Sequence, residues 1–572
     1  MVIPQQAGLT VKALSPDKTV MGEADGVYGP AGNSPLYARG ECKGPPRGLR
    51  SCRASHGDYA VTREIRQLAQ KRAHPRTSVR SEEEGGGCRK SEAPIGAMRS
   101  GNADGAKGCR FGRTGQGNMG RHRAGEAMTT RLTRLTQKVR ELLGERLTSL
   151  MGTLFDPEGL RSSFERQEER KAPGVDGVRK ADYREGLEER IQELSRRVRS
   201  LGYRPKPVRR VYLPKGEGRY RALGIPSFED RLVQDRLSQI LQAIWEPEFC
   251  ECSYGFRPDR SAHDALRRVA EIVTWEGTRW VVEADIKGFF DHVSHVHLMR
   301  FLEHRISDPC FLRIIRRFLK AGVMEDGVVS TSEEGTPQGG LVSPVLANIY
   351  LHYVLDLWFE KRFKRSCRGK AYLVRYADDF IACFQDEEDA RRFVQELEKR
   401  LAAFDLEVEP SKTRVLRFGS RARQDCHRDG LGRPETFHFL GFTHFVSLSR
   451  RGRFVVGRKT EGRRFRKKLK LLNQRLRNLR VEGGRIMMEY MKYHLRGHIQ
   501  YYGVSGNMKS LKAYFYLACR LLFKWLNRRS QRRSMTGPSF WAVITRWLPR
   551  VQIVHNLYPQ PSWRTQTGSR MV

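Results

Sequence analysis

The chain has 572 residues and a formal net charge of +41, far more positive charge than solubility requires, so a polyanionic partner is expected. Its length suffices for about two to four domains, and its 11 cysteines include no Cys-x-x-Cys pair, which argues against a zinc ribbon or a disulfide framework. No stretch of 18 apolar residues and no secretion signal occur, so the sequence predicts a cytoplasmic protein without a membrane partner.

Residues 1–127 are predicted to be a disordered basic extension. They are rich in Gly, Pro, Ser and Arg and contain no Trp, so they cannot bury enough apolar surface to offset the entropy of ordering. Met128 would make a natural start, in which case the extension has no separate function. The alternative is a flexible basic arm that binds RNA.

A folded region is expected from residue 128 onwards. Apolar residues at three- and four-residue steps predict an amphipathic helix at its start. They are Leu132, Leu135, Val139, Leu142, Leu143, Leu147 and Leu150. Residues 171–178 are typical of a Gly/Pro loop, and residues 181–201 of a charged helix.

Two short strands, 211–215 and 221–226, flank a polar turn. A basic hairpin of this kind can close over a triphosphate, with Lys215 and Arg221 giving charge-assisted contacts to its oxygens. The alternative is an ordinary solvated turn, since Lys and Arg are abundant throughout the chain. A helix is predicted to follow from Glu229 to about Trp245.

Three aspartates stand at the ends of apolar strands. Asp285 ends the strand that begins near Arg279, while Asp378 and Asp379 occupy the turn of a hairpin over residues 373–384. Adjacent carboxylates against apolar strands repel each other unless a cation holds them. Three acids on two strand ends can hold two Mg²⁺ ions, the recurring device for in-line phosphoryl transfer. The alternative for the Asp-Asp pair alone is a solvated turn.

Between and after these strands, further elements are predicted. Residues 337–344 form a Gly-rich segment that opens a helix over 345–361, and the helix N-terminus favours negative charge. A second helix over 387–404 completes a β-α-β-β-α-β order.

The C-terminal segment is the most basic part of the chain. Residues 451–572 hold 28 Lys and Arg against 3 Asp and Glu, a net charge of +25. Leucines predict a helix over residues 465–479 whose opposite face carries Arg475 and Arg477 among other cations. A second basic and aromatic stretch contains Arg528 and Arg529, and aromatics between basic residues suit RNA.

Five ordered motifs give the chain a family resemblance. Asp285 with Phe290 comes first, and the remaining motifs are Pro337-Gln338-Gly339-Gly340, Tyr376-Ala377-Asp378-Asp379, Lys412-Thr413 and Phe439-Leu440-Gly441-Phe442. In this order they resemble a group II intron reverse transcriptase over roughly residues 130–550. The resemblance implies an α+β right-hand polymerase whose fingers and palm span 128–445. A mostly helical thumb and maturase domain would span 446–550, and 551–572 would be a tail without an endonuclease domain.

The resemblance also implies residue roles. The catalytic and metal-binding residues would be Asp285, Asp378 and Asp379. Phe290 would exclude ribonucleotides, although Phe290 could instead be a core residue, and Lys412 would lie near the departing pyrophosphate. Gln338 would contact the nucleotide, and Gly339 and Arg257 the template, with a core ion pair as the alternative for Arg257.

The function expected from this resemblance is RNA-directed DNA polymerisation together with intron RNA binding that assists splicing. The partners would be the intron RNA, an RNA template with a DNA primer, a DNA target and deoxynucleotides. Two alternatives remain: an intron-independent relative of the same polymerases, and an RNA-binding maturase whose polymerase site has decayed.

Overall fold

The computed structural model describes residues 130–142, 144–216, 219–325, 328–330, 335, 339–528 and 535–559. The predicted extension over 1–127 and the last residues of the predicted tail lie outside these ranges. So do the side chains of Lys215 and Arg221, and the whole of Gln338 and Arg529. None of the helices in the described ranges is long and apolar enough to cross a bilayer.

The first folded region is helical. Its helices are α2 (Thr130–Glu141), α3 (Met151–Leu154), α4 (Pro157–Arg166), α5 (Lys180–Arg184), α6 (Leu187–Arg199) and α7 (Phe228–Trp245). The predicted leucine-rich helix is correct for α2 but wrong beyond Glu141, because Gly144 has a φ of +90° and the chain leaves the helical conformation there. Leu147 and Leu150 are buried outside that helix.

A hairpin of β1 (Val208–Gly216) and β2 (Arg219–Ile225) confirms the two predicted strands. It belongs to a four-stranded sheet of order β2-β1-β4-β5, in which β4 (Val323–Glu325) pairs with β1 in parallel. The last strand is β5 (Val328–Ser330), which lies at the edge.

The central sheet has the order β6-β7-β3-β8, and all neighbouring strands in it are antiparallel. Its strands are β3 (Trp280–Asp285), β6 (Ala371–Tyr376), β7 (Asp379–Phe384) and β8 (Arg414–Arg417). A helix formed by α11 (Ser343–Leu351), η2 (His352–Asp356) and α12 (Leu357–Lys361) precedes β6, and α13 (Glu387–Ala402) precedes β8. This succession confirms the predicted β-α-β-β-α-β order.

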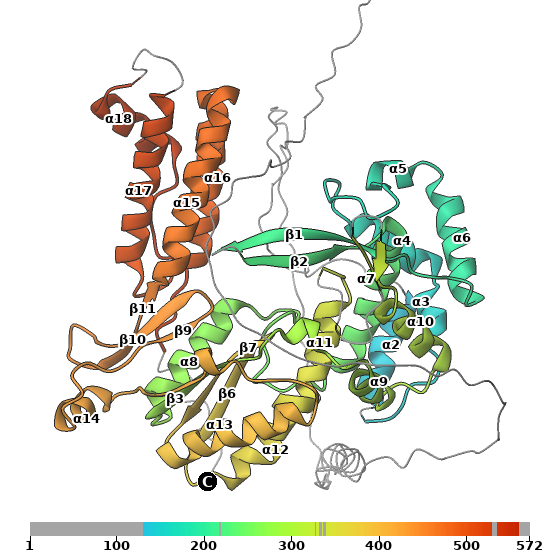
Figure 1. Ribbon diagram of the computed structural model, residues 1–572, viewed down its shortest axis with the longest axis horizontal. Coiled ribbons are helices and arrows are strands. Elements are labelled where there is room, and N and C mark those ends of the chain that lie inside the picture. Colours follow the sequence, from blue (N-terminus) through green and yellow to red (C-terminus); the bar gives the residue numbers. More distant parts are fainter. Residues whose placement is uncertain are drawn as a thin grey trace, which may run out of the picture. The chain divides into compact units, whose positions relative to one another are not determined.

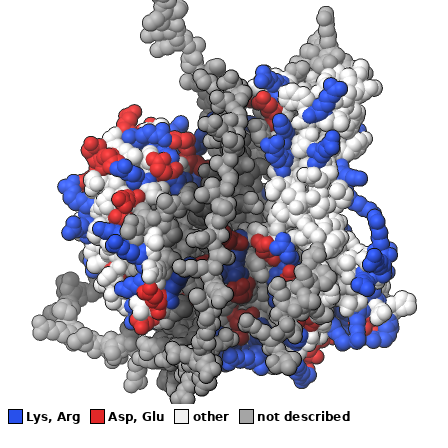
Figure 2. All heavy atoms as spheres, turned by 180° about the vertical axis from the view of Figure 1, so that it is seen from behind, with Lys and Arg blue, Asp and Glu red and all other residues white. Residues whose placement is uncertain are grey.

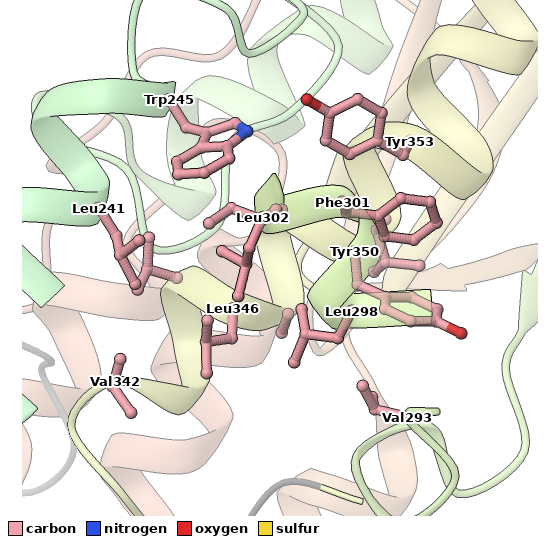
Figure 3. Packing of buried hydrophobic residues seen from close by; sticks show 14 of the residues in the cluster. Leu241, Trp245, Val293, Leu298, Phe301, Leu302, Val342, Leu346, Tyr350 and Tyr353 are labelled. Carbon is pink, nitrogen blue, oxygen red and sulfur yellow. The ribbon is translucent and has the colours of Figure 1, made fainter. Parts of the chain in front are cut away.

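The two faces of the central sheet enter different cores, as the alternation of side chains along a strand requires. Leu373 and Val282 face the larger core, whereas Val374 and Val281 face the core that includes α8 (Ala262–Trp275). Figure 3 shows the larger core where side chains from α7, α11 and α9 (His295–Glu303) meet. The strand ends that carry the aspartates are therefore fixed from both sides.

A third sheet and four long or medium helices follow the central sheet in the chain. The strands are β9 (Phe437–Phe439), β10 (Phe442–Leu448) and β11 (Phe454–Thr460), and the helices are α15 (Gly462–Leu479), α16 (Gly484–Tyr502), α17 (Met508–Leu526) and α18 (Gly537–Trp547). Helices α15, α16 and α17 lie side by side (Figure 1). Leu472 and Leu476 of α15 and Met491 of α16 are buried between them, which confirms the predicted apolar face.

The remaining short helices are α10 (Pro309–Leu319), α14 (Ala422–Arg428), η1 (Phe289–Asp291), η3 (Phe363–Ser366), η4 (Pro410–Lys412) and η5 (Arg480–Glu482).

Candidate active site

The three predicted aspartates meet at one end of the central sheet. Asp285 lies directly opposite Asp379 in the antiparallel pairing of β3 with β7, so their Cα atoms are about 4.5–5.5 Å apart. Asp378 belongs to the two-residue turn between β6 and β7, because Tyr376 pairs with Asp379. The sheet register therefore brings together carboxylates that are 93 and 94 positions apart in the chain.

The turn itself has an unusual backbone. Ala377 is buried and has a φ of +59°, a conformation that L residues other than Asn and Asp rarely adopt and that costs about 1–2 kcal/mol. Gly255 lies against this turn so closely that a Cβ atom at residue 255 would be 2.4 Å from the amide nitrogen of Ala377. Glycine at position 255 is therefore required by the position of the turn.

The three carboxylates repel one another. Burial, followed by the neighbouring Asp378 and Asp285 carboxylates, raises the pKa of Asp379 to about 7. The backbone N–H of Leu440 donates a hydrogen bond to Asp379, and with the Arg464 guanidinium it opposes this rise. Positive charge brought to this point stabilises the ionised form of all three aspartates.

Lys412 supplies such a charge. The Lys412 ammonium donates to the Asp285 carboxylate, and η4 holds it there because the backbone N–H of Glu409 donates to the Asp285 carbonyl at 2.8 Å. The Lys412 side chain is 58% exposed, so the ion pair is open to solvent on one side. The structure thus places Lys412 at the carboxylates, next to the reacting centre that the sequence predicts.

The donor set suits Mg²⁺ in its chemistry, since carboxylate oxygens are the ligands that this hard cation prefers. Within the described ranges, no group of three or more His, Cys, Asp or Glu side chains is arranged as metal ligands are. Asp285 is instead paired with Lys412. The side chains as placed form an ion-paired arrangement, and a divalent cation would take over the role of that ammonium.

Phe290 lies on η1, the short helix that follows β3. Its ring is partly buried and contacts the buried Phe289 edge-on, with ring centroids 5.3 Å apart. Phe289 is the core phenylalanine of the pair, whereas Phe290 is partly buried and packs against the same core from its edge. The role of Phe290 in sugar selection and its alternative as a core residue both stay predictions.

Gly339 contacts β2. It has a φ of +117°, and a Cβ atom there would be 2.4 Å from the carbonyl oxygen of Gly224. The neighbouring backbone N–H of Leu341 donates to the Gln234 side chain at 2.8 Å. Residues 339–341 therefore lie between β2 and α7, and the backbone to which Gly339 comes close is that of Gly224.

Arg257 corresponds to its alternative interpretation. The Arg257 side chain is 4% exposed, and it donates to the Glu246 carboxylate from Nε at 3.0 Å and from Nη2 at 2.7 Å. Its Nη1 donates to the carbonyl oxygens of Cys250 and Ser253. A side chain so enclosed is a core ion-pair partner. The structure therefore places the Arg257 side chain in the core rather than in the predicted contact with the template.

Of the predicted RNA-contacting arginines of the C-terminal region, those within the described ranges are exposed. Arg475 and Arg477 lie on the outer face of α15, and the Arg475 guanidinium lies 5.8 Å from the Tyr490 ring. Arg528 follows α17 and lies 5.9 Å from the ring of Trp525. Figure 2 shows many Lys and Arg and few acidic residues on the face of this region that it presents.

Sequence reasoning missed the buried polar residues under the turn. Arg375 of β6 is fully buried, and its partners Asp356 and Asn348 come from the helix that precedes β6. The available signal was a charged residue in the middle of the apolar run 373–384, which is rare unless the charge is paired.

Comparisons with known proteins agree with the motifs. Residues 213–444 match the family described as reverse transcriptase (RNA-dependent DNA polymerase), a range that contains all three aspartates. Protein YkfC of Escherichia coli (strain K12) is 39% identical over 237 residues, which are 36% of this chain and 62% of that protein.

Two intron proteins are also similar. The group II intron-encoded protein LtrA of Lactococcus lactis subsp. cremoris is 33% identical over 299 residues, 50% of this chain and 49% of LtrA. An uncharacterized 91 kDa protein in a cob intron of Schizosaccharomyces pombe is 41% identical over 170 residues, 30% of this chain and 21% of that protein. The chain thus spans less than two thirds of each of these relatives. The comparisons confirm the resemblance inferred from the motifs.

Proposed function

We propose that this chain, which carries a reverse transcriptase domain and is related to group II intron-encoded proteins, is an RNA-directed DNA polymerase that also binds its intron RNA. The observation that carries the proposal is the meeting of Asp285, Asp378 and Asp379 at the ends of adjacent strands within the matched domain. In this proposal residues 128–445 are the fingers and palm, residues 446–550 are the thumb and maturase domain, and the protein works in the cytoplasm.

The reaction is nucleotidyl transfer. The 3′-hydroxyl oxygen of a DNA primer forms a bond to the α-phosphorus of a deoxynucleotide, the bond to the β-phosphate oxygen breaks, and pyrophosphate leaves. Two Mg²⁺ ions, when bound by the three aspartates, would stabilise the charge that develops on the attacking and departing oxygens.

Other side chains of the site have their own roles in the proposed reaction. Lys412, which is paired with Asp285 in the structure, is in this proposal the general acid for the departing pyrophosphate. Phe290 packs beneath the sugar and excludes a 2′-hydroxyl by contact. The cations of the β1–β2 hairpin, Lys215 and Arg221, hold the triphosphate, and Gln338 contacts the incoming nucleotide.

Splicing assistance and mobility rest on the C-terminal region. Residues 451–572 carry a net charge of +25, and Arg475 and Arg477 lie on the outer face of α15, one of three packed helices. Such a surface binds structured RNA through phosphate contacts. The intron RNA, an RNA template with a DNA primer, and a DNA target are the proposed partners.

The test is primer extension by the full chain on an RNA template, with deoxynucleotides and Mg²⁺. The protein should extend the primer, and Asp378→Asn should lower the rate by at least about 10³-fold while leaving RNA affinity within about twofold. Extension by the Asp378→Asn variant at the rate of the unmodified protein would remove this site from the chemistry. A lack of extension by the unmodified protein would disprove the polymerase assignment.

A further inference from the structure

Arg375 of β6 is a fully buried arginine two residues before the catalytic turn. Its Nε donates to Asp356 Oδ1 at 2.7 Å, and its Nη2 donates to Asp356 Oδ2 at 2.5 Å and to Ser253 Oγ at 2.8 Å. Its Nη1 donates to Asn348 Oδ1 at 3.0 Å and to the carbonyl oxygen of Ala377 at 2.9 Å. All five N–H groups of the guanidinium are therefore engaged, one of them by the turn itself.

A π-turn aligns the two side chains that accept from Arg375 on the preceding helix. Residues seven apart share a face of a regular α-helix, since two turns take about 7.2 residues. Asn348 and Asp356 are eight apart, and the π-helical segment His352–Asp356 between them adds the one residue that returns Asp356 to the face of Asn348. The irregularity of the helix thus serves the contact with Arg375.

The same residues hold the segment that packs against the turn. The Asn348 amide donates to the carbonyl oxygen of Gly255 at 2.7 Å. The backbone N–H of Arg375 donates to the Cys252 carbonyl, and the Tyr254 N–H donates to the Arg375 carbonyl, both at 2.8 Å. Arg375 therefore lies between the turn and the Gly255 segment and is bonded to both.

Stability alone is a weak reason for such an arrangement. Replacing a buried ion pair by apolar residues of similar volume is often neutral or stabilising. What five directed hydrogen bonds do provide is a single permitted position for each partner, here including the backbone of a turn with a positive φ at Ala377.

We propose that Arg375 is a positioning residue for the catalytic carboxylates, in that it fixes the turn at the position where Asp378 and Asp379 can share divalent cations with Asp285. This inference rests on the proposed polymerase function. Partners that orient metal ligands typically change metal affinity by about 10- to 100-fold when they are removed, and misplacement of reacting groups by about 1 Å can lower a rate by about 10²-fold.

The experiment replaces the ion pair by apolar residues in the full chain, with Arg375→Met and Asp356→Leu combined so that no buried charge is left unpaired. Mn²⁺ binding is measured by electron paramagnetic resonance, which does not depend on polymerisation. Primer extension then gives kcat, the KM for template-primer and the Mg²⁺ concentration at half-maximal rate.

A matched control is available in Arg400→Met. Arg400 is also buried, and it donates to the backbone carbonyls of Val354 and Tyr353 in the same π-helical segment. Both of these bonds go to the helix rather than to the turn, so the loss of Arg400 should lower stability without altering metal binding.

We expect the Arg375/Asp356 variant to bind Mn²⁺ about 10- to 100-fold more weakly and to lose about 10²-fold in kcat, with the KM for template-primer within about twofold. Mn²⁺ affinity equal to that of the Arg400→Met control would overturn the inference. If circular dichroism shows that the double variant is unfolded, Arg375→Lys decides by the same criteria, because lysine keeps the charge but lacks the fork that reaches five acceptors. Should the unmodified protein extend no primer, the proposed function fails, while Mn²⁺ binding still decides the role of Arg375.

Discussion

The central sheet and the helices α15–α17 accommodate positive charge in opposite ways. At the central sheet the buried Arg375 faces Asp356, and on α7 the fully buried Arg236 lies 3.5 Å from Asp156. On α15–α17 acidic residues are nearly absent, and most cations are exposed. The arginines at the central sheet fix an internal geometry, whereas the cations of α15–α17 are mostly exposed and far outnumber the carboxylates near them, which suits an external polyanion.

The buried polar groups at the central sheet also differ from those in the helices α15–α17. Those beneath the turn are bonded to partners that are themselves held by hydrogen bonds. In the C-terminal helices, Lys468, His494 and His498 pack around the ring of Tyr514, and burial lowers the pKa of Lys468 to about 8. The function of the central sheet should therefore be sensitive to small displacements, and that of the helices α15–α17 to changes of charge.

The largest effect is expected from one methyl group at the turn. Gly255→Ala places a Cβ atom 2.4 Å from the Ala377 amide nitrogen, which forces backbone to move beside Asp378. Primer extension should fall by about 10²-fold. RNA affinity, set by the C-terminal charge, should stay within about twofold in a filter-binding assay.

Gly152→Ala on α3 is the matched control, because its Cβ atom would meet nothing closer than 3.8 Å. It should retain full extension and add slightly to stability. If both variants kept normal extension rates, the turn would tolerate displacement. The central sheet would then not differ from the helices α15–α17 in its dependence on exact positions.

For the central sheet and the helices around it, the sequence predicted the elements that local patterns encode. The Asp-Asp hairpin, α7, α13 and the β-α-β-β-α-β order follow from hydrophobic period and turn chemistry. The partners of buried charges could not be predicted, since Arg375 bonds to Ser253, 122 residues away, and meets Asp356 only through a π-turn. Arg257 was equally ambiguous until Glu246 was placed beside it.

Charge reversal tests the helices α15–α17. Arg475→Glu with Arg477→Glu keeps the buried Leu472–Leu476 face of α15 and removes two exposed cations. If each contacts a phosphate, the slope of log affinity against log salt should become shallower by about 1.4–1.8. Intron RNA binding and splicing assistance should weaken, while extension on a short template continues.

Arg421→Glu with Arg423→Glu makes the same charge change at exposed positions around α14. This control should leave the salt slope unchanged. Equal loss of RNA binding in both double variants would mean that net charge, rather than the helical surface, determines affinity. Equal loss of polymerisation and RNA binding in the α15 variant would mean that one nucleic-acid track serves both activities.

The smallest effect concerns acid stability of the C-terminal helices. His498 is buried, its ring stacks on that of Tyr514 with centroids 3.7 Å apart, and its ring nitrogens have no hydrogen-bond partner among the described residues. Burial, with Lys468 and His494 adding repulsion, lowers the pKa of His498 to about 2. The unfolded chain protonates this histidine near its ordinary pKa of about 6.5, while the folded chain does not.

Stability is therefore complete above about pH 6.5 and falls as the pH decreases below it, by up to about 1.4 kcal/mol per pH unit for this group. His498→Phe keeps an aromatic ring on Tyr514 and cannot titrate, so its unfolding free energy should fall less between pH 6.5 and pH 5 than that of the unmodified chain. Urea unfolding followed by circular dichroism at both pH values measures the difference. His427→Gln, at an exposed position on α14, should lose as much stability as the unmodified chain. If His498→Phe and His427→Gln lost the same unfolding free energy between pH 6.5 and pH 5, His498 would take up its proton without unfolding of the chain. The helices α15–α17 would then tolerate a buried positive charge as well as the exposed ones.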